Sequence, residues 1–193
     1  PLLEQVVAEA DAAGRVSDKV RAAFLLGELL RRAGDLDEAE RFVEMLFKVA
    51  DATGDHRARA YGLNLCGCIH GDRGELQSSL ECFEQYLETA RQIGSGPGER
   101  SALNQLACVH SARGDLDKAL ECHRQCLAAS PKAGDAQRRA TSYFNIGRSL
   151  NAMGRWTAGT ENLHRSIALC EEYGFVDPLA SARMSLGELL LKR

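Results

Sequence analysis

The stretch that decides the fold reads Ala22-Ala23-Phe24-Leu25-Leu26-Gly27-Glu28-Leu29-Leu30, and the pair Gly34-Asp35 follows it. Its apolar residues recur at intervals of three and four, which is the period of one face of an α-helix. Glycine adopts the left-handed backbone that ends a helix at little cost, and an acidic residue favours the start of the next helix. The stretch therefore predicts a helix, a tight turn and a second helix.

Glycines and other small residues repeat this design at a spacing of 40 residues. Two series of glycines fall at the expected turns: Gly14, Gly54, Gly94, Gly134 and Gly174, and Gly34, Gly74, Gly114 and Gly154. Two further series are Gly27, Gly67, Ala107, Gly147 and Gly187, and Ala39, Ser79, Ala119 and Gly159. These small residues are expected where helix A meets helix B of one unit, so that the two backbones approach closely. Since two such helices cannot bury their apolar faces alone, the units are expected to stack as a solenoid.

The composition favours an all-α chain and excludes several classes of protein. Only 8 Val, 4 Ile and 5 Thr occur among 193 residues, which is few for a β-sheet. No apolar run approaches the roughly 20 residues that cross a bilayer. The net charge of −3 lacks the basic footprint of a nucleic-acid binder. Neither a membrane nor a nucleic acid is therefore an expected partner.

The repeat unit resembles the tetratricopeptide repeat. That pattern places a Leu-Gly pair in helix A, a Gly turn seven residues later, and then Ala, an aromatic residue and Ala in helix B. The first unit carries Leu26-Gly27, Gly34, Ala39, Val43 and Leu46, and the second carries Cys66-Gly67, Gly74, Ser79, Phe83 and Tyr86. The fourth unit departs most, with Gly159 and Leu163. The period of 40 is similar to the long-helix subtype of Pins/LGN-type adaptors and kinesin light chains.

The resemblance implies one right-handed α–α superhelix of about ten antiparallel helices over residues 1–193. We expect a leading helix B at 1–19, repeats at 20–59, 60–99, 100–139 and 140–179, and a partial fifth repeat at 180–193. The ends of the chain favour a piece of a longer protein. Two interpretations of Ser95-Gly96-Pro97-Gly98 stay open: a hinge between two halves, or a helix that begins with Pro97 in its first turn.

The resemblance also implies a concave groove that is lined by the A helices and binds a peptide or a partner helix. The groove positions are Arg21, Phe24, Glu28, Tyr61, Asn64, Ser101, Asn104, Thr141, Phe144, Arg148 and Asn151. No Lys stands at a groove position, so a clamp for a C-terminal carboxylate of the co-chaperone type is not expected. Asn64 and Asn104 hold the same position in adjacent units. Either they form a ladder for the backbone of an extended peptide, or each bonds a neighbouring helix.

Seven cysteines, an odd number, and no secretory signal indicate the reducing cytoplasm. No metal site is expected. The side chains of Cys66 and Cys68 point apart on a helix, Cys122 and Cys126 share a face without a second pair, and His70 faces away from Cys68. No catalytic or phosphate-binding motif occurs, so neither an enzyme nor a cofactor is expected.

Two hypotheses for the function remain. The first is a cytoplasmic scaffold that binds a protein or peptide in the groove. The alternative is a regulatory sensor segment of a larger signalling or transcription protein. A homodimer is a further expectation, because the last helix A, from Leu179 to Leu191, lacks its helix B and leaves an apolar side bare.

Overall fold

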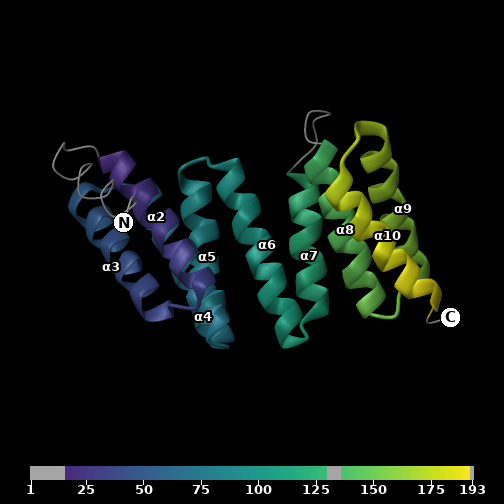
Figure 1. The fold of residues 1–193 in the computed structure, drawn as a ribbon, viewed down its shortest axis with the longest axis horizontal. Coiled ribbons are helices and arrows are strands. Elements are labelled where there is room, and N and C mark those ends of the chain that lie inside the picture. Colours follow the sequence, from purple (N-terminus) through teal and green to yellow (C-terminus); the bar gives the residue numbers. More distant parts are fainter. Residues whose placement is uncertain (1–15, 130–135, 192–193) are drawn as a thin grey trace. The chain divides into compact units, whose positions relative to one another are not determined.

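The computed structural model describes residues 16–129 and 136–191. In these ranges the chain forms nine α-helices and no strand, which confirms the all-α class (Figure 1). The helices are α2 (Val16–Ala33), α3 (Leu36–Thr53), α4 (His56–Asp72), α5 (Leu76–Gln92), α6 (Gly96–Arg113), α7 (Leu116–Ala128), α8 (Ala136–Ala152), α9 (Trp156–Tyr173) and α10 (Val176–Leu191). Most of the expected leading helix B at 1–19 lies outside the described residues, and its last residues, 16–19, belong to α2.

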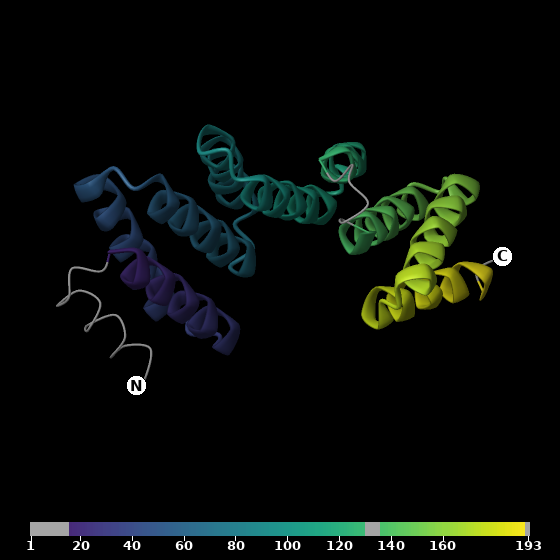
Figure 2. The same cartoon turned by 90° about the horizontal axis from the view of Figure 1, so that it is seen from above.

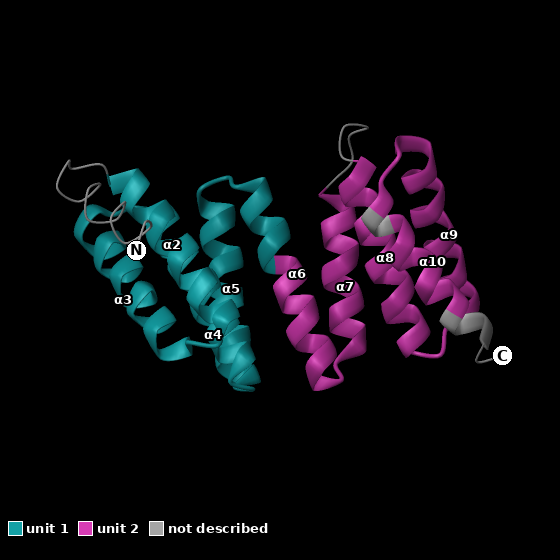
Figure 3. Cartoon of the chain, in the orientation of Figure 1, with its two compact units in different colours: residues 1–102 teal, residues 103–193 magenta. Residues whose placement is uncertain are grey.

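The chain divides into two compact units, residues 1–102 and residues 103–193, and the division falls inside α6 (Figure 3). In unit 1, α2 packs on α3 and α4 packs on α5, and α4 also contacts the preceding α3 and α2 (Figures 1 and 2). In unit 2, α8 contacts α7, α9 and α10. The A helices α2, α4 and α8 thus each contact the B helix that follows them, and α4 and α8 also contact a neighbouring repeat, as stacked repeats require.

The turns between helices have the predicted chemistry. Gly74 has φ of 77°, in the left-handed region, and no side chain crowds it. Its N–H donates to the carbonyl of Gly71, and the N–H of Glu75 reaches back to the carbonyl of His70 at 2.8 Å. These bonds satisfy carbonyls at the end of α4 that have no partner within the helix.

The acidic residue after a turn glycine starts the next helix, but only some of these residues cap it with their side chains. Asp55 Oδ1 accepts a hydrogen bond from the backbone N–H of Arg57 at 2.8 Å, and Asp35 accepts one from Glu38 at 3.3 Å. Glu75 occupies the same place before α5 without a side-chain capping bond. Its carboxylate instead lies against His70 on α4.

Close approach of helix A to helix B requires the predicted small residues. A Cβ atom at Gly67 would lie 2.7 Å from Cε1 of Phe83, which is a buried ring on α5. Ser79 is fully buried, and its hydroxyl donates to the carbonyl of Gly67 at 2.7 Å. Gly187 on α10 differs, since no atom of another described residue, apart from its chain neighbours and its own helix backbone, lies within 4 Å of a Cβ built there.

Pro97 is the second residue of α6 and lies in its first turn. Ser95 caps this turn, because its hydroxyl accepts from the backbone N–H of Gly98 at 3.2 Å. This placement agrees with the interpretation of Pro97 as a helix start. Within residues 16–129 and 136–191, no helix is both long and apolar enough to cross a bilayer.

Candidate functional site

The predicted groove residues of unit 1 lie on α2, α4 and the first part of α6. Phe24 on α2 stacks on Tyr61 of α4, with ring centroids 4.7 Å apart and an angle of 23° between the planes. Glu28, one turn after Phe24, accepts from Arg31 Nε at 3.1 Å. Arg31 also bridges to Asp72 on α4 at 2.6 Å. Stacking and ion pairing therefore join the A helices of two successive repeats.

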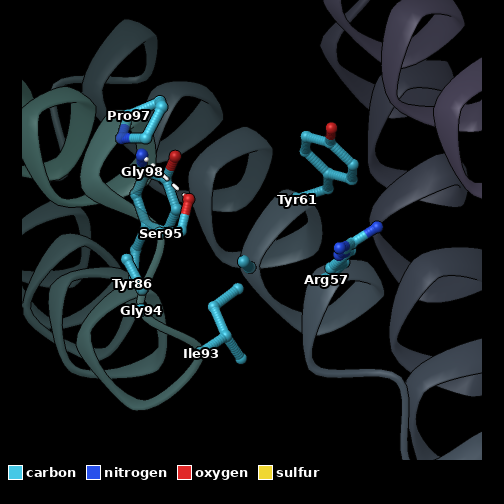
Figure 4. A pocket seen from close by; sticks show the side chains of 10 residues that line it. Arg57, Tyr61, Tyr86, Ile93, Gly94, Ser95, Pro97 and Gly98 are labelled. Atoms are coloured by element: carbon cyan, nitrogen blue, oxygen red, sulfur yellow. Dashed lines mark hydrogen bonds between the residues drawn. The ribbon is translucent and has the colours of Figure 1, made fainter.

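A cavity of about 470 Å³ opens beside this aromatic stack, between α4, α5 and the start of α6 (Figure 4). Its lining residues are Arg57, Ala60, Tyr61, Tyr86, Ala90, Ile93, Gly94, Ser95, Pro97 and Gly98. Figure 4 shows Arg57 and Tyr61 on one wall, and Tyr86, Ile93 and Ser95 on the opposite wall. The cavity combines apolar surface with hydroxyl groups and one guanidinium, which is the usual character of a binding pocket.

Tyr86 joins this cavity to a further predicted groove residue. Burial raises the pKa of the Tyr86 phenol, and a hydrogen bond with Ser101 on α6 partly opposes that effect. The side chain is only 6% exposed. Of the predicted positions, Tyr61 thus lines the cavity and Ser101 contacts its wall. The sequence reasoning missed Tyr86 and Arg57, because it assigned Tyr86 to the helix packing and considered only A-helix positions that face the groove.

The two equivalent asparagines have different surroundings. Asn104 Oδ1 accepts from Cys126 Sγ at 3.6 Å, across to α7. The residue 40 positions earlier than Cys126 is Tyr86, which pairs with Ser101 instead. Asn64 Oδ1 is accordingly buried without a hydrogen-bond partner among the residues that the structure describes. Asn64 lies one helical turn after Tyr61, so both lie on the same face of α4.

The remaining predicted groove residues lie in unit 2, on α8. Thr141 donates its hydroxyl to the carbonyl of Gln137 in its own helix, at 3.0 Å. The guanidinium of Arg148 lies 5.6 Å from the ring centre of Phe144. Asn151 Oδ1 is buried and occupies the space that a Cβ of Gly159 would need. Phe144 and Arg148 therefore form a cation–π pair, whereas Asn151 fills the contact between α8 and α9.

A second group of polar side chains lies between α4 and α5. Cys66 Sγ and Cys82 Sγ are 3.3 Å apart, and His70 Nδ1 is 2.5 Å from Glu75 Oε2. The ligand atoms of Cys66, His70 and Cys82 all lie within 4.8 Å of one another. The sequence reasoning missed this cluster because it compared Cys66 and His70 each with Cys68. The signal was the spacing of four residues between Cys66 and His70, which places both on one face of a helix.

The electrostatics of this cluster are coupled. The hydrogen bond from the Cys82 thiol, more than the nearby His70, lowers the pKa of Cys66 to about 6 against the opposing effect of burial. The same bond and burial raise the pKa of Cys82. Burial lowers the pKa of His70, but Glu75 and Cys66 together outweigh it and raise that pKa. Cys66 is therefore the more acidic sulfur of the pair, and the Cys82 thiol donates to it.

Solved structures share the fold at low sequence identity. BtubC (BKLC) from P. vanneervenii has a TM-score of 0.85 at 21% identity, over 97% of this chain and 80% of that chain. The STAND protein with a tetratricopeptide repeat sensor from Pyrococcus horikoshii has a TM-score of 0.76 at 15% identity. That match covers 85% of this chain but only 26% of the archaeal chain. Kinesin light chain TPR-like repeats from Podosopora anserina have a TM-score of 0.66 at 20% identity, over 89% and 92% of the two chains.

A search of curated protein sequences gave no match. The family model described as tetratricopeptide repeat matches residues 19–92 and 69–132. These two overlapping spans cover more than half of the chain, and they include the turns, the small residues and the helix pairs of unit 1 described above. The chain therefore belongs to the tetratricopeptide repeat family.

Proposed function

We propose that this chain is a protein-interaction scaffold that binds an extended peptide segment of its partner over α4 of unit 1. Tetratricopeptide repeats generally mediate protein–protein binding, and the chain belongs to that family. The observation that carries the finer proposal is the cavity at Tyr61 and Tyr86, with the unpaired Asn64 oxygen one helical turn away. The proposal assigns no catalytic role and no cofactor to the chain.

The cavity suits one anchoring side chain of a peptide. The two tyrosine rings and Ile93 offer apolar surface to an aromatic or aliphatic anchor, and the hydroxyl groups offer hydrogen bonds. Arg57 adds a positive charge at the same cavity, which favours an acidic residue beside the anchor. The proposed ligand is therefore an extended segment with an apolar anchor and a neighbouring carboxylate.

Asn64 supplies the contact to the peptide backbone in this proposal. A buried carbonyl oxygen without a partner costs about 1–3 kcal/mol of folding free energy. Rotation of the carboxamide toward the cavity lets a peptide N–H satisfy that oxygen, so binding recovers part of this cost. The predicted ladder with Asn104 requires that Asn104 exchange its bond with Cys126 for one to the peptide.

Selection from a displayed library of random linear peptides tests the proposal, followed by affinity measurements on the selected peptides by fluorescence polarisation. We expect Tyr61→Ala and Asn64→Ala each to weaken binding about tenfold or more, which is about 1.4 kcal/mol. Asn162→Ala is the matched control, because Asn162 lies on helix α9 and its side-chain amide donates to the carbonyl of Ala158 in the same helix. Peptides that bind both variants as well as the parent chain would place the binding site elsewhere.

Thermal melting separates the two roles of Asn64. If Asn64 serves binding, Asn64→Ala loses affinity while its melting temperature stays the same or rises, since the removed oxygen has no hydrogen bond to lose. If it serves packing, the melting temperature falls. The double variant with Asn104→Ala then reports whether the second asparagine adds affinity or stability.

A regulatory sensor is the second candidate, favoured by the fold shared with the archaeal STAND protein, whose repeats are described as a sensor. In this alternative, peptide binding in unit 1 changes the dynamics of unit 2. Hydrogen exchange of unit 2 with and without a selected peptide distinguishes the two. A change confined to unit 1 supports the scaffold, and a change that extends to α8 and α9 supports the sensor.

We also infer self-association through α10 and a cytoplasmic location. Met184 and Val176 on α10 are 67% and 75% exposed, which supports an apolar contact between two copies. Light scattering over a concentration series, with Met184→Lys as the variant, tests the dimer. The seven cysteines support a reducing compartment, and imaging of the tagged full-length protein tests that location.

A further inference from the structure

We propose that Cys66, His70 and Cys82 form a binding site for one thiophilic divalent cation of the zinc class. Their three ligand atoms already lie within 4.8 Å of one another. A cation bound to all three would sit between α4 and α5, inside the second repeat. This inference is independent of the proposed peptide site, which lies on other residues.

The repeat itself brings the three side chains together. Cys66 and His70 are four residues apart on α4, so they point to one side of that helix. Next to Cys66, Gly67 lets α5 approach closely, and the Ser79 hydroxyl is hydrogen bonded to the Gly67 carbonyl at 2.7 Å. This close contact places Cys82 of α5 beside Cys66, with the sulfur atoms 3.3 Å apart.

The geometry needs little adjustment for a metal. Two thiolates at about 2.3 Å from a tetrahedral zinc ion are roughly 3.8 Å apart, so the sulfur atoms would separate slightly. Two sulfur ligands and one imidazole nitrogen favour zinc or cobalt over magnesium and calcium, which prefer oxygen ligands. The three side chains are half-buried, which leaves a fourth coordination position for water or for a side chain of a partner.

Glu75 completes the arrangement from outside the ligand set. It lies 2.5 Å from Nδ1 of His70, and therefore leaves Nε2 as the nitrogen that can bind a metal. A carboxylate that holds the other ring nitrogen of a ligand histidine is the usual companion of zinc sites, where it fixes the ring and its tautomer. Glu75 stands at the N-cap place of α5 without capping it, so its position is explained by His70.

The third repeat provides a natural comparison. Forty residues after the proposed ligands and Glu75 stand Leu106, His110, Cys122 and Asp115. His110 and Asp115 are again neighbours, with Nδ1 and Oδ2 3.7 Å apart. Leucine thus replaces one thiol, and only two ligands remain. The same backbone carries a complete set in the second repeat and an incomplete set in the third.

Binding exchanges protons for the metal. The Cys82 thiol releases its proton to solvent, Cys66 releases one wherever it is still protonated, and His70 binds as the neutral imidazole. Two thiolates then balance the two charges of the cation. No oxidant or reductant takes part, and the protein is otherwise unchanged.

Titration of the reduced, metal-free full chain with Co²⁺, followed by competition with Zn²⁺, tests the site. We expect one equivalent of Co²⁺ to give thiolate-to-cobalt charge-transfer absorption and the d–d bands of a tetrahedral site. Cys66→Leu, which installs the residue of the third repeat, should abolish both, and so should Cys82→Ala. Glu75→Gln should weaken binding by about 10–100-fold. Cys108→Ser, at an exposed thiol, is the matched control and should bind like the parent chain.

A variant that gains a second metal site tests the proposal without relying on variants that could damage the fold. Leu106→Cys completes the set in the third repeat and should raise the stoichiometry from one to two equivalents of Co²⁺. Absence of the charge-transfer absorption in the parent chain would overturn the proposal, as would unchanged binding by Cys66→Leu. The proposal is also overturned if Leu106→Cys binds only one equivalent of Co²⁺. If the reduced protein binds no Co²⁺ and Cys66 and Cys82 form a disulfide in air, the two thiols serve redox chemistry instead and the proposal is wrong.

Discussion

At Gly67 in unit 1, an added methyl group meets a buried aromatic ring. A Cβ atom there lies 2.7 Å from Cε1 and 2.9 Å from Cζ of Phe83. Phe83 is only 2% exposed, so its ring has no solvent-filled space to turn into. Gly67→Ala therefore moves the ring from its rotamer or moves α5 away from α4.

Two opposing effects set the size of this change. Overpacking a core contact costs about 1–3 kcal/mol, whereas replacing glycine by alanine inside a helix gains about 1 kcal/mol. The net destabilisation of Gly67→Ala is therefore about 0–2 kcal/mol. Gly187 stands at the equivalent place of its repeat, but no described residue beyond its chain neighbours and its own helix backbone lies within 4 Å of its added Cβ. Gly187→Ala thus has only the gain in helix propensity, and the free energies of unfolding of the two variants should differ by about 1–3 kcal/mol.

Urea denaturation followed by helical circular dichroism measures both variants under one condition. We expect a lower midpoint for Gly67→Ala and an equal or higher midpoint for Gly187→Ala. Adding Phe83→Leu to Gly67→Ala should recover part of the loss, since the fourth repeat holds Leu163 at this place. If Gly67→Ala is as stable as Gly187→Ala, the close approach of the Phe83 ring carries no energetic cost and this prediction is wrong.

Three further changes test other features of the fold. Burial, with a smaller effect of Arg148, lowers the pKa of His123 to about 4. The unfolded chain therefore binds a proton that the folded chain does not between about pH 6.5 and 4. The free energy of unfolding is then highest above this window and falls by roughly 3 kcal/mol as the pH drops through it, and His123→Leu should flatten that slope in urea denaturation. Asp55→Ala should cost about 1 kcal/mol by the same assay through its lost cap, whereas Asp115→Ala, with no capping bond, should stay within about 0.5 kcal/mol. Gly74→Ala should cost about 1 kcal/mol, measured as a lower melting temperature, because its φ of 77° strains an alanine.

The fold could be predicted from the sequence because its requirements are local and recur. A turn with positive φ favours glycine wherever it occurs, so Gly34, Gly74 and Gly114 mark the ends of three A helices. The close contact between helices likewise demands small residues at Gly67 and Ser79. One such residue is weak evidence, but a spacing of 40 repeated along the chain is strong evidence for the all-α repeat fold.

The candidate sites were less predictable because they depend on which side chains meet between helices. The cavity needs Tyr61 from α4, Tyr86 from α5 and Ser95 before α6 at once. No pattern within one helix contains that information. The pair Cys66 and His70 was visible in the sequence, but only the packing of α5 shows that Cys82 joins it.

Repeat symmetry explains why the fold could be predicted from the sequence and why the candidate sites could not. Equivalent positions of the repeats have similar surroundings, so the residues that the repeats share predict the fold. The candidate binding sites lie where one repeat carries a different residue from the others. Tyr86 in place of Cys126 leaves Asn64 without the partner that Asn104 has, and it also lines the cavity with Tyr61, one helical turn before Asn64. Cys66 in place of Leu106 adds the third ligand to a histidine and a cysteine that both repeats share. Both departures fall in the second repeat, so this repeat is where substitutions should change binding while leaving the solenoid intact.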